Sequence, residues 1–278
     1  MRITFLGTGT SVGVPQIGCT CPTCTSSDPR DKRRRCGLYV RADDVAFLVD
    51  APPELRLACI ENKISKVDAV LLTHAHMDHV AGFDDIRRFN TINGEIVPCD
   101  PASPGANGRT FRVIGKTMPC YALPETIAQM HSIFPYIGTR GGEMGLFRPQ
   151  IEFIDNTAPF TIGPLSIKAL RVEHSFPCCG YVMREGGRKF GYISDCHMIA
   201  DDALAELEGA DLMVLNCLRE REHPTHLSLS RAKEYLARIN AKKSLLVHMC
   251  HDFTHAQWLE KLAGTNISPA YDNLELEV

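Results

Sequence analysis

The sequence predicts an α/β protein in which helices cover the outer faces of stacked sheets. Apolar segments of strand length recur along the chain, with amphipathic segments of helix length between some of them. Several strand segments are continuously apolar, which is typical of strands covered on both faces. The chain has 278 residues, of which 44% are hydrophobic and 23% charged, as in folded globular proteins. We therefore expect one domain spanning residues 1–278.

The two kinds of segment can be placed along the chain. The expected strands are Ile3–Leu6, Val45–Val49, Ala69–Leu72, Leu165–Val172, Phe190–Ile193, Leu212–Leu215 and Leu245–Val247. The expected helices are Pro53–Asn62, Val80–Phe89, Pro124–Phe134, Ala203–Glu208, Ser228–Ile239 and His255–Leu262. Ser228 is a preferred N-cap residue, and Gly264 follows the last helix, where glycine favours a helix end.

Two stretches rich in proline and glycine interrupt this order. They are Cys99–Pro119 and Gly138–Pro149, with a helical pattern between them. Such composition is typical of loops with little regular structure. We expect a loop insertion around residues 99–150, which is either a surface excursion or a cap over an active site.

Charge and cysteine content restrict the class of protein. Lys and Arg number 30 against 33 Asp and Glu, a net charge of −3, so a large basic surface for nucleic acid is not expected. No stretch approaches the roughly 20 apolar residues of a membrane span, and the N-terminus enters a strand without an apolar export region. We expect a cytoplasmic protein with no membrane partner, whose twelve cysteines stay reduced and are buried or bind metal.

The strongest chemical signal is a cluster of histidines and aspartate after the strand Ala69–Leu72. His74 and His76 are two residues apart, so on an extended chain their rings project to the same side. Asp78 and His79 follow where the chain turns into a helix and can face a second ion. Three imidazoles and a carboxylate this close together would be costly to bury without a cation.

This cluster resembles the H-x-H-x-D-H signature of the metallo-β-lactamase superfamily. The resemblance implies a four-layer αβ/βα sandwich with a two-metal site at one edge of the stacked sheets. It also implies further ligands at strand ends, and His174, Asp195 and His248 each follow an apolar strand. Carried onto this sequence, one ion is held by His74, His76 and His174, the other by Asp78, His79 and His248, and Asp195 bridges them.

A second metal-ligand pattern lies near the N-terminus. Cys19, Cys21 and Cys24 form C-x-C-x-x-C, three thiolates where a tetrahedral zinc site takes four ligands. His251 completes a structural Cys₃His zinc site if the strand carrying His248 ends beside this loop. Cys250 is the competing fourth ligand.

Together these features resemble the phosphoribosyl cyclic phosphodiesterase family of bacterial phosphonate degradation. The likeness runs from Leu6-Gly7-Thr8-Gly9-Thr10 through the three cysteines to His248-x-x-His251, and the segment around 99–150 departs from it. The family carries a catalytic histidine at the position of His226, just before a helix, which implies a proton donor. His223 is the alternative.

A small-residue loop, Gly7–Ser11, leaves the first strand. Its backbone amides can approach a phosphate, so Gly9, Thr10 and Ser11 are expected to bind substrate together with His226. The loop lacks the lysine of a P-loop, and a plain tight turn is the alternative.

We therefore expect a dinuclear metal-dependent phosphodiesterase. Two divalent ions, zinc or manganese, generate a metal-bound hydroxide that attacks phosphorus, with His226 as proton donor and Asp78 as an essential ligand. Two carboxylates against four positive charges leave the centre cationic, which favours a small phosphorylated substrate and nucleoside or sugar monophosphates as product-like ligands.

The alternatives are a transfer-RNA 3′-end endonuclease, a hydroxyacylglutathione-type thioesterase and a non-catalytic nucleotide-binding module. The sequence leaves the physiological substrate, the native metal and the oligomeric state open, with a homodimer as one option.

Overall fold

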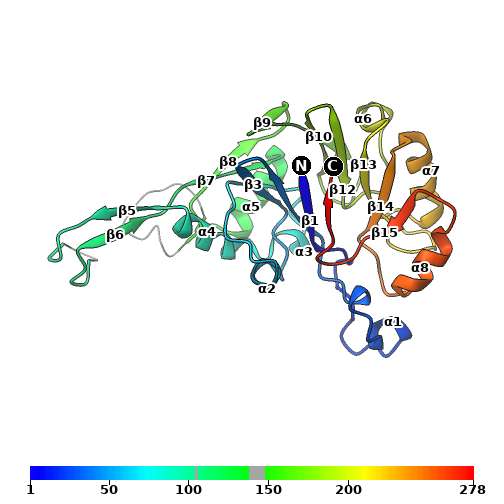
Figure 1. Ribbon diagram of the computed structural model, residues 1–278, viewed down its shortest axis with the longest axis horizontal. Helices are drawn as coiled ribbons and strands as arrows, with labels where there is room; N and C mark the ends of the chain where they lie inside the picture. The colour runs from blue at the N-terminus through cyan, green and yellow to red at the C-terminus, as the bar shows by residue number, and fades with distance from the viewer. Residues whose placement is uncertain (104–105, 138–147) are drawn as a thin grey trace.

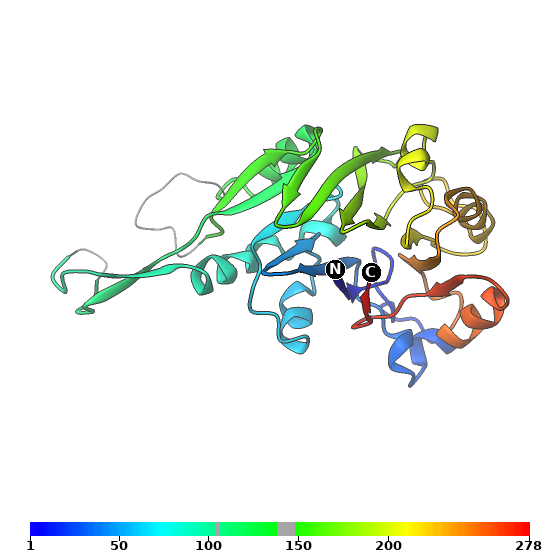
Figure 2. The same cartoon turned by 45° about the horizontal axis from the view of Figure 1, so that its top comes forward.

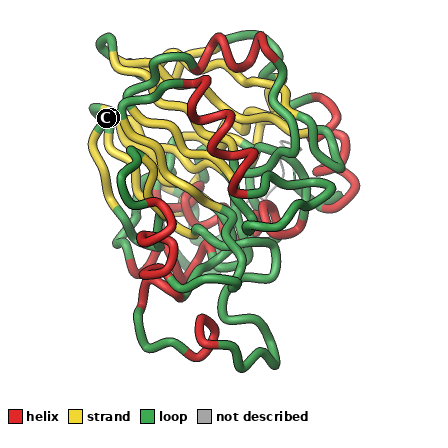
Figure 3. Tube along the Cα trace, turned by 90° about the vertical axis from the view of Figure 1, so that its right-hand side faces the viewer, coloured by secondary structure: helices red, strands yellow, loops and turns green. Residues whose placement is uncertain are grey.

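The protein is a four-layer sandwich in the computed structural model, which describes residues 1–103, 106–137 and 148–278. Two seven-stranded sheets pack face to face, and helices cover both outer faces (Figures 1 and 3). The fold class expected from the sequence is confirmed.

The N-terminal sheet carries the histidine motif at one edge. In spatial order its strands are β16 (Glu275–Glu277), β1 (Arg2–Gly7), β2 (Gly37–Ala42), β3 (Val45–Val49), β4 (Ala69–Leu71), β7 (Met118–Ala122) and β8 (Ile151–Asp155). Strands β3 and β4 are parallel, with Val49 opposite Leu71. Their carboxyl ends therefore meet, and the chain after β3 lies beside the chain after β4.

The C-terminal sheet brings further polar residues to the same edge of the sandwich. In spatial order its strands are β15 (Ile267–Pro269), β14 (Lys243–Val247), β13 (Leu212–Asn216), β12 (Arg188–Ile193), β11 (Cys178–Glu185), β10 (Leu165–Val172) and β9 (Phe160–Ile162). Strands β12 to β15 run parallel. Asp195 follows β12 and His248 follows β14, so both leave the sheet at its carboxyl edge.

Helices pack on the two outer faces through their apolar sides. Over the N-terminal sheet lie α2 (Leu55–Glu61), α3 (Met77–Val80), the 3-10 helix η2 (Phe83–Ile86), α4 (Arg87–Ile92) and α5 (Pro124–Ile133). Over the C-terminal sheet lie α6 (Asp201–Leu207), α7 (Leu229–Ile239) and α8 (His255–Leu262). The short helices α1 (Pro22–Thr25) and η1 (Pro29–Asp31) belong to a loop that extends beyond the sheets (Figure 3). None of the helices in the described part of the chain combines the length and apolarity that a bilayer crossing requires.

The central core lies between the sheets. Phe5 and Phe47 from one sheet share a cluster with Tyr192 and Val214 from the other, and all four are at most 1% exposed. Burying one such side chain contributes about 1.5–3 kcal/mol to the free energy of folding. This layer therefore holds the two sheets together, with the edges that carry the polar residues side by side.

One expected helix is broken into pieces. The sequence predicts a helix over Val80–Phe89, but the chain forms α3, η2 and α4 in succession. The amide of Gly82 donates to the carbonyl of Ala51 at 2.9 Å, and a Cβ on Gly82 would lie 2.1 Å from the carbonyl oxygen of Pro52. This close approach to the segment after β3 interrupts the helix.

The predicted loop Cys99–Pro119 also contains regular structure, which corrects the sequence-based interpretation. Strand β5 (Glu95–Pro98) pairs antiparallel with β6 (Phe111–Ile114), and this hairpin projects from the sandwich (Figures 1 and 2). Most of the other stretch, Gly138–Pro149, lies outside the described residues. A cap role for the segment around 99–150 stays a prediction.

Candidate metal centre

Three histidines from two sheets meet at the carboxyl edge of the sandwich. His74 and His76 follow β4, and His174 follows β10. Nε2 of His74 lies 2.9 Å from Nδ1 of His76, and Nε2 of His174 lies 3.3 Å from the same atom. The structure thus brings together the three residues expected to hold one ion.

The second expected group also converges. His79 and Asp78 lie on α3, and Nε2 of His79 is 3.3 Å from Oδ2 of Asp78. Nε2 of His248 is 3.5 Å from the same carboxylate oxygen. His248 adopts a left-handed backbone conformation with φ of 58°, which ends β14 and is uncommon for a residue with a side chain.

Asp195 stands between the two groups. Its Oδ2 lies 3.1 Å from Nε2 of His79, and its Oδ1 lies 3.1 Å from Nε2 of His248. Burial alone would raise the pKa of Asp195, but the neighbouring His248 and His79 outweigh it and hold this pKa well below the usual range. The carboxylate is therefore negatively charged at neutral pH.

The hydrogen-bonding pattern of the histidines fits a shared cation. Nδ1 of His74 lies 3.0 Å from the Thr73 hydroxyl, Nδ1 of His79 lies 2.7 Å from Asp50, and Nδ1 of His174 lies 2.9 Å from the Thr225 carbonyl. With the Nδ1 protons donated to these acceptors, each Nε2 faces inward and can bind a cation once it is deprotonated.

Several inward atoms have no partner of their own. Among the described residues, Nε2 of His79, Nε2 of His248 and Oδ2 of Asp195 are buried and make no hydrogen bond of acceptable geometry, although each histidine nitrogen lies 3.1 Å from an oxygen of the Asp195 carboxylate. Buried polar atoms that converge without pairing are costly, and a divalent cation would satisfy them. The donor set of imidazoles and carboxylates suits zinc, manganese or iron.

Asp50 is a component of the site that the sequence analysis missed. It follows β3, is fully buried, and accepts hydrogen bonds from the Thr73 amide and hydroxyl, both at 2.8 Å, as well as from His79. Burial raises the pKa of Asp50, while the adjacent His79 opposes this shift. The available signal was a carboxylate directly after the apolar strand Val45–Val49.

Replacing Asp50 with asparagine is expected to weaken metal binding. Carboxylates that orient ligating histidines typically contribute a factor of about 10–100 in metal affinity. Competition with a chelator of known affinity measures the change, and Asp44→Asn, at an exposed carboxylate, is the control. Unchanged affinity in a folded Asp50→Asn protein would remove Asp50 from this role.

His226 lies at the rim of the same centre. Its Nδ1 is 3.5 Å from Oδ1 of Asp195, and its ring stacks on that of His248 with centroids 4.6 Å apart. Burial, reinforced by His248, lowers the pKa of His226 to about 3 in the ion-free protein. The ring of His223, the alternative proton donor, lies next to that of His226, with centroids 5.1 Å apart.

The small-residue loop after β1 is bonded within the chain. The amide of Gly9 donates to the Arg34 carbonyl at 2.7 Å, and the amide of Thr10 donates to the Met249 carbonyl at 3.2 Å. These two amides are therefore not available to a phosphate, which corrects the interpretation of Gly9 and Thr10. Ser11 is exposed, and its substrate contact stays a prediction.

The loop has another consequence, because it holds the segment that carries His248. The Met249 amide donates to the Thr8 carbonyl at 3.2 Å, so Met249 is hydrogen-bonded to the loop on both sides. A Cβ on Gly9 would lie 2.8 Å from Cβ of Arg33, so only glycine permits this packing. The small residues thus serve close packing beside the metal centre.

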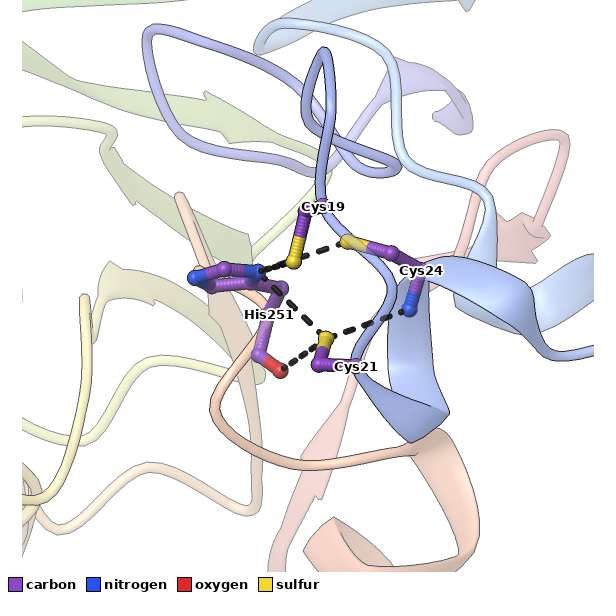
Figure 4. Close-up of side chains that lie close together, drawn as sticks. All are labelled: Cys19, Cys21, Cys24 and His251. Carbon is purple, nitrogen blue, oxygen red and sulfur yellow. Dashed lines mark hydrogen bonds between the residues drawn. The ribbon is translucent and has the colours of Figure 1, made fainter.

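The three cysteines gather around one histidine, as Figure 4 shows. Nδ1 of His251 lies 3.3 Å from Sγ of Cys19, 3.5 Å from Sγ of Cys21 and 3.3 Å from Sγ of Cys24. One ring nitrogen cannot form hydrogen bonds with three thiols. In a tetrahedral zinc site the sulfur and nitrogen ligands are about 3.6 Å apart, given bond lengths of about 2.3 and 2.0 Å. The arrangement therefore fits a Cys₃His zinc site, and Cys250 is not part of this group among the described residues.

These features agree with what comparison with known proteins shows. Residues 45–249 match the model of the β-lactamase superfamily domain, so the chain belongs to this superfamily, whose members are mostly hydrolases. A solved structure described as a new diphosphatase from the PhnP family superposes with a TM-score of 0.82 at 29% identity, covering 100% of this chain and 97% of that one. The family resemblance inferred from the motifs is confirmed.

Other relatives have different names. An octanoyltransferase of Porphyromonas gingivalis is 33% identical over 282 residues, covering 99% of this chain and 51% of that protein, so the chain spans about half its length. Coenzyme PQQ synthesis protein B of Methylorubrum populi is 26% identical, covering 78% of this chain and 72% of that protein. The Zn²⁺-bound PqqB of Methylobacterium extorquens, at 18% identity and a TM-score of 0.75 with complete coverage of both chains, shows the fold alone.

Proposed function

We propose that this protein is a phosphodiesterase that uses two divalent ions to hydrolyse a small phosphodiester. The observation that carries the proposal is the position of Asp195, whose two carboxylate oxygens each lie 3.1 Å from a histidine of the second group. Asp195 also forms a potential ligand group with His74 and His79. One carboxylate reaching both groups favours two ions over one.

The residues divide between two ions as the geometry of their donor atoms suggests. His74, His76 and His174 would hold one ion, Asp78, His79 and His248 the other, with Asp195 shared. When bound, such ions act as Lewis acids that lower the pKa of water and neutralise phosphoryl oxygens. Zinc and manganese are both candidates.

The charge of the centre supports an anionic substrate. Two divalent ions bring four positive charges, and Asp78 and Asp195 bring two negative ones. Both carboxyls have pKa values below their usual range, because the adjacent histidines outweigh the effect of burial. A net positive charge in a partly buried site attracts a phosphate ester and its monophosphate product.

His226 is the candidate proton donor for the departing oxygen. A water molecule loses a proton as its oxygen forms the new bond to phosphorus, the bond from phosphorus to the ester oxygen breaks, and that oxygen takes a proton from His226. The ring is neutral in the ion-free protein, and a phosphate anion beside it would raise its pKa and favour the protonated form. The similarity to a PhnP-family diphosphatase is a further support, since that protein is named for cleavage of a phosphate linkage.

Hydrolysis of bis-p-nitrophenyl phosphate tests the proposal. The purified protein is expected to release p-nitrophenolate in the presence of Mn²⁺ or Zn²⁺, and a folded His76→Ala variant is expected to lose this activity. Absence of turnover with either metal would contradict the proposal and favour a binding module.

The role of His226 has its own prediction. General acid catalysis contributes about 10²–10⁴ in rate, and only where the leaving group needs a proton. His226→Ala is therefore expected to lower kcat for a 2′,3′-cyclic nucleotide, whose leaving group is an alkoxide, far more than for bis-p-nitrophenyl phosphate. His223→Ala is the matched comparison. An equal loss of activity on both substrates would contradict a proton-donor role.

A further inference from the structure

Phe176 is an exposed aromatic residue beside the metal centre that the mechanism above does not use. It lies in the connection from β10 to β11, two residues after His174, and 46% of its surface is exposed. Among the described residues it belongs to none of the three hydrophobic clusters. Its exposure leaves an apolar aromatic surface beside the candidate metal ligands that a bound group can cover.

The ring of Phe176 is nevertheless held in place. It packs against the ring of His76 with centroids 4.8 Å apart and an interplanar angle of 69°. Pro177 follows directly and restricts the backbone of Phe176 to extended conformations.

Phe176 begins a series of ring contacts that leads to His226. Successive centroid distances are 4.8 Å from Phe176 to His76, 5.0 Å from His76 to His174 and 5.1 Å from His174 to His226. Two potential metal ligands therefore link Phe176 to the candidate proton donor. A phosphate bound at these ligands can direct its leaving oxygen to His226 and its other substituent toward Phe176.

Resting on the proposed function, we propose that Phe176 binds the ester group that stays on phosphorus, and that this group is a nucleobase or another flat aromatic group. An aromatic face that is fixed and exposed is the surface on which bases stack. A cyclic sugar phosphate has no flat π-face and would cover less of the Phe176 ring than a base does. The substrate class is then a nucleotide-like diester.

Two esters with the same leaving group test this assignment. The p-nitrophenyl ester of thymidine 5′-monophosphate and methyl p-nitrophenyl phosphate both release p-nitrophenolate and differ only in the retained group. Phe176→Ala is expected to lower kcat/KM for the thymidine ester roughly tenfold or more, the usual range for loss of one base stack, while the methyl ester changes little. Phe176→Tyr is expected to restore the preference.

The control is Phe111→Ala, at an exposed aromatic residue on β6, which is expected to leave both esters unchanged. Metal content measured for each variant shows whether His76 still binds its ion. An equal loss on both esters would overturn the assignment, because Phe176 would then only support His76. No loss on either ester would also overturn it, because Phe176 would then have no role in substrate binding.

A binding measurement separates this inference from the proposed hydrolysis. Calorimetric titration of the zinc-loaded protein compares thymidine 5′-monophosphate with methyl phosphate. If the wild-type protein binds the nucleotide more tightly than methyl phosphate and the Phe176→Ala variant does not, the inference is supported. This holds even if neither ester is turned over, in which case only the hydrolytic proposal fails. Equal affinity of the wild-type protein for both ligands overturns the inference about Phe176.

Discussion

Replacing Asp195 with asparagine is expected to lower kcat/KM for bis-p-nitrophenyl phosphate by about a thousandfold or more. The change removes the one negative charge that reaches both ligand groups while keeping the size of the side chain. Metal ions typically contribute several kcal/mol to phosphoryl transfer, and about 4 kcal/mol corresponds to a factor of a thousand. Steady-state kinetics together with elemental analysis of bound metal measures both effects.

The exposed Asp44→Asn substitution serves again as the control, since it removes the same charge away from the centre. Circular dichroism shows whether the Asp195 variant is folded, which matters because Asp195 is only 1% exposed. A folded variant with wild-type turnover and full metal content would show that Asp195 does not bridge.

Replacing Cys21 with serine is expected to remove one equivalent of zinc and to lower Tm strongly. Structural zinc contributes about 10–16 kcal/mol in small zinc-binding peptides. Loss of only about 3 kcal/mol would lower the Tm of a domain of this size by about 6–12 °C. Elemental analysis and calorimetry measure the two quantities.

Cys99→Ser is the matched control for the zinc site. Cys99 is partly exposed, and its thiol lies 3.3 Å from the Arg109 carbonyl, away from the other cysteines. Its replacement is expected to change neither zinc content nor Tm by much. Full zinc content in the Cys21→Ser protein would contradict ligation by Cys21.

Local patterns predict the α/β class, and the resemblance carried by the histidine motif implies the four-layer fold and the convergence of the seven candidate ligands. His74, His76, Asp78 and His79 lie within six residues, so one strand and one helix turn suffice to orient them. Asp195 and His248 follow continuously apolar strands, and parallel strands bring such residues to one edge.

Asp50 was missed because its role depends on contacts that no local pattern contains. Only the parallel pairing of β3 with β4 places it beside Thr73 and His79, 23 and 29 residues later. The broken helix after His79 has the same origin, since Gly82 packs against Pro52. Strand β2 was also missed, and it is defined by pairing with β1 and β3 on either side.

The loop residues Gly9 and Thr10 illustrate a different limit. Their composition suits both an anion-binding loop and a tightly packed turn, and only the hydrogen bonds to Arg34 and Met249 distinguish the two. Phe176 has no distinguishing pattern either, because exposure of an aromatic residue cannot be derived from its neighbours in the chain.

The hydrogen bonds that fix Met249 to the loop after β1 have a consequence for how the protein responds to its surroundings. His248 and His251 lie on one short stretch of backbone, and His248 belongs to the candidate metal centre while His251 faces the thiols. An oxidant or chelator that attacks the cysteines at the periphery therefore acts three residues away from the pocket without entering it. The thiol group and the candidate metal centre therefore share a single backbone segment.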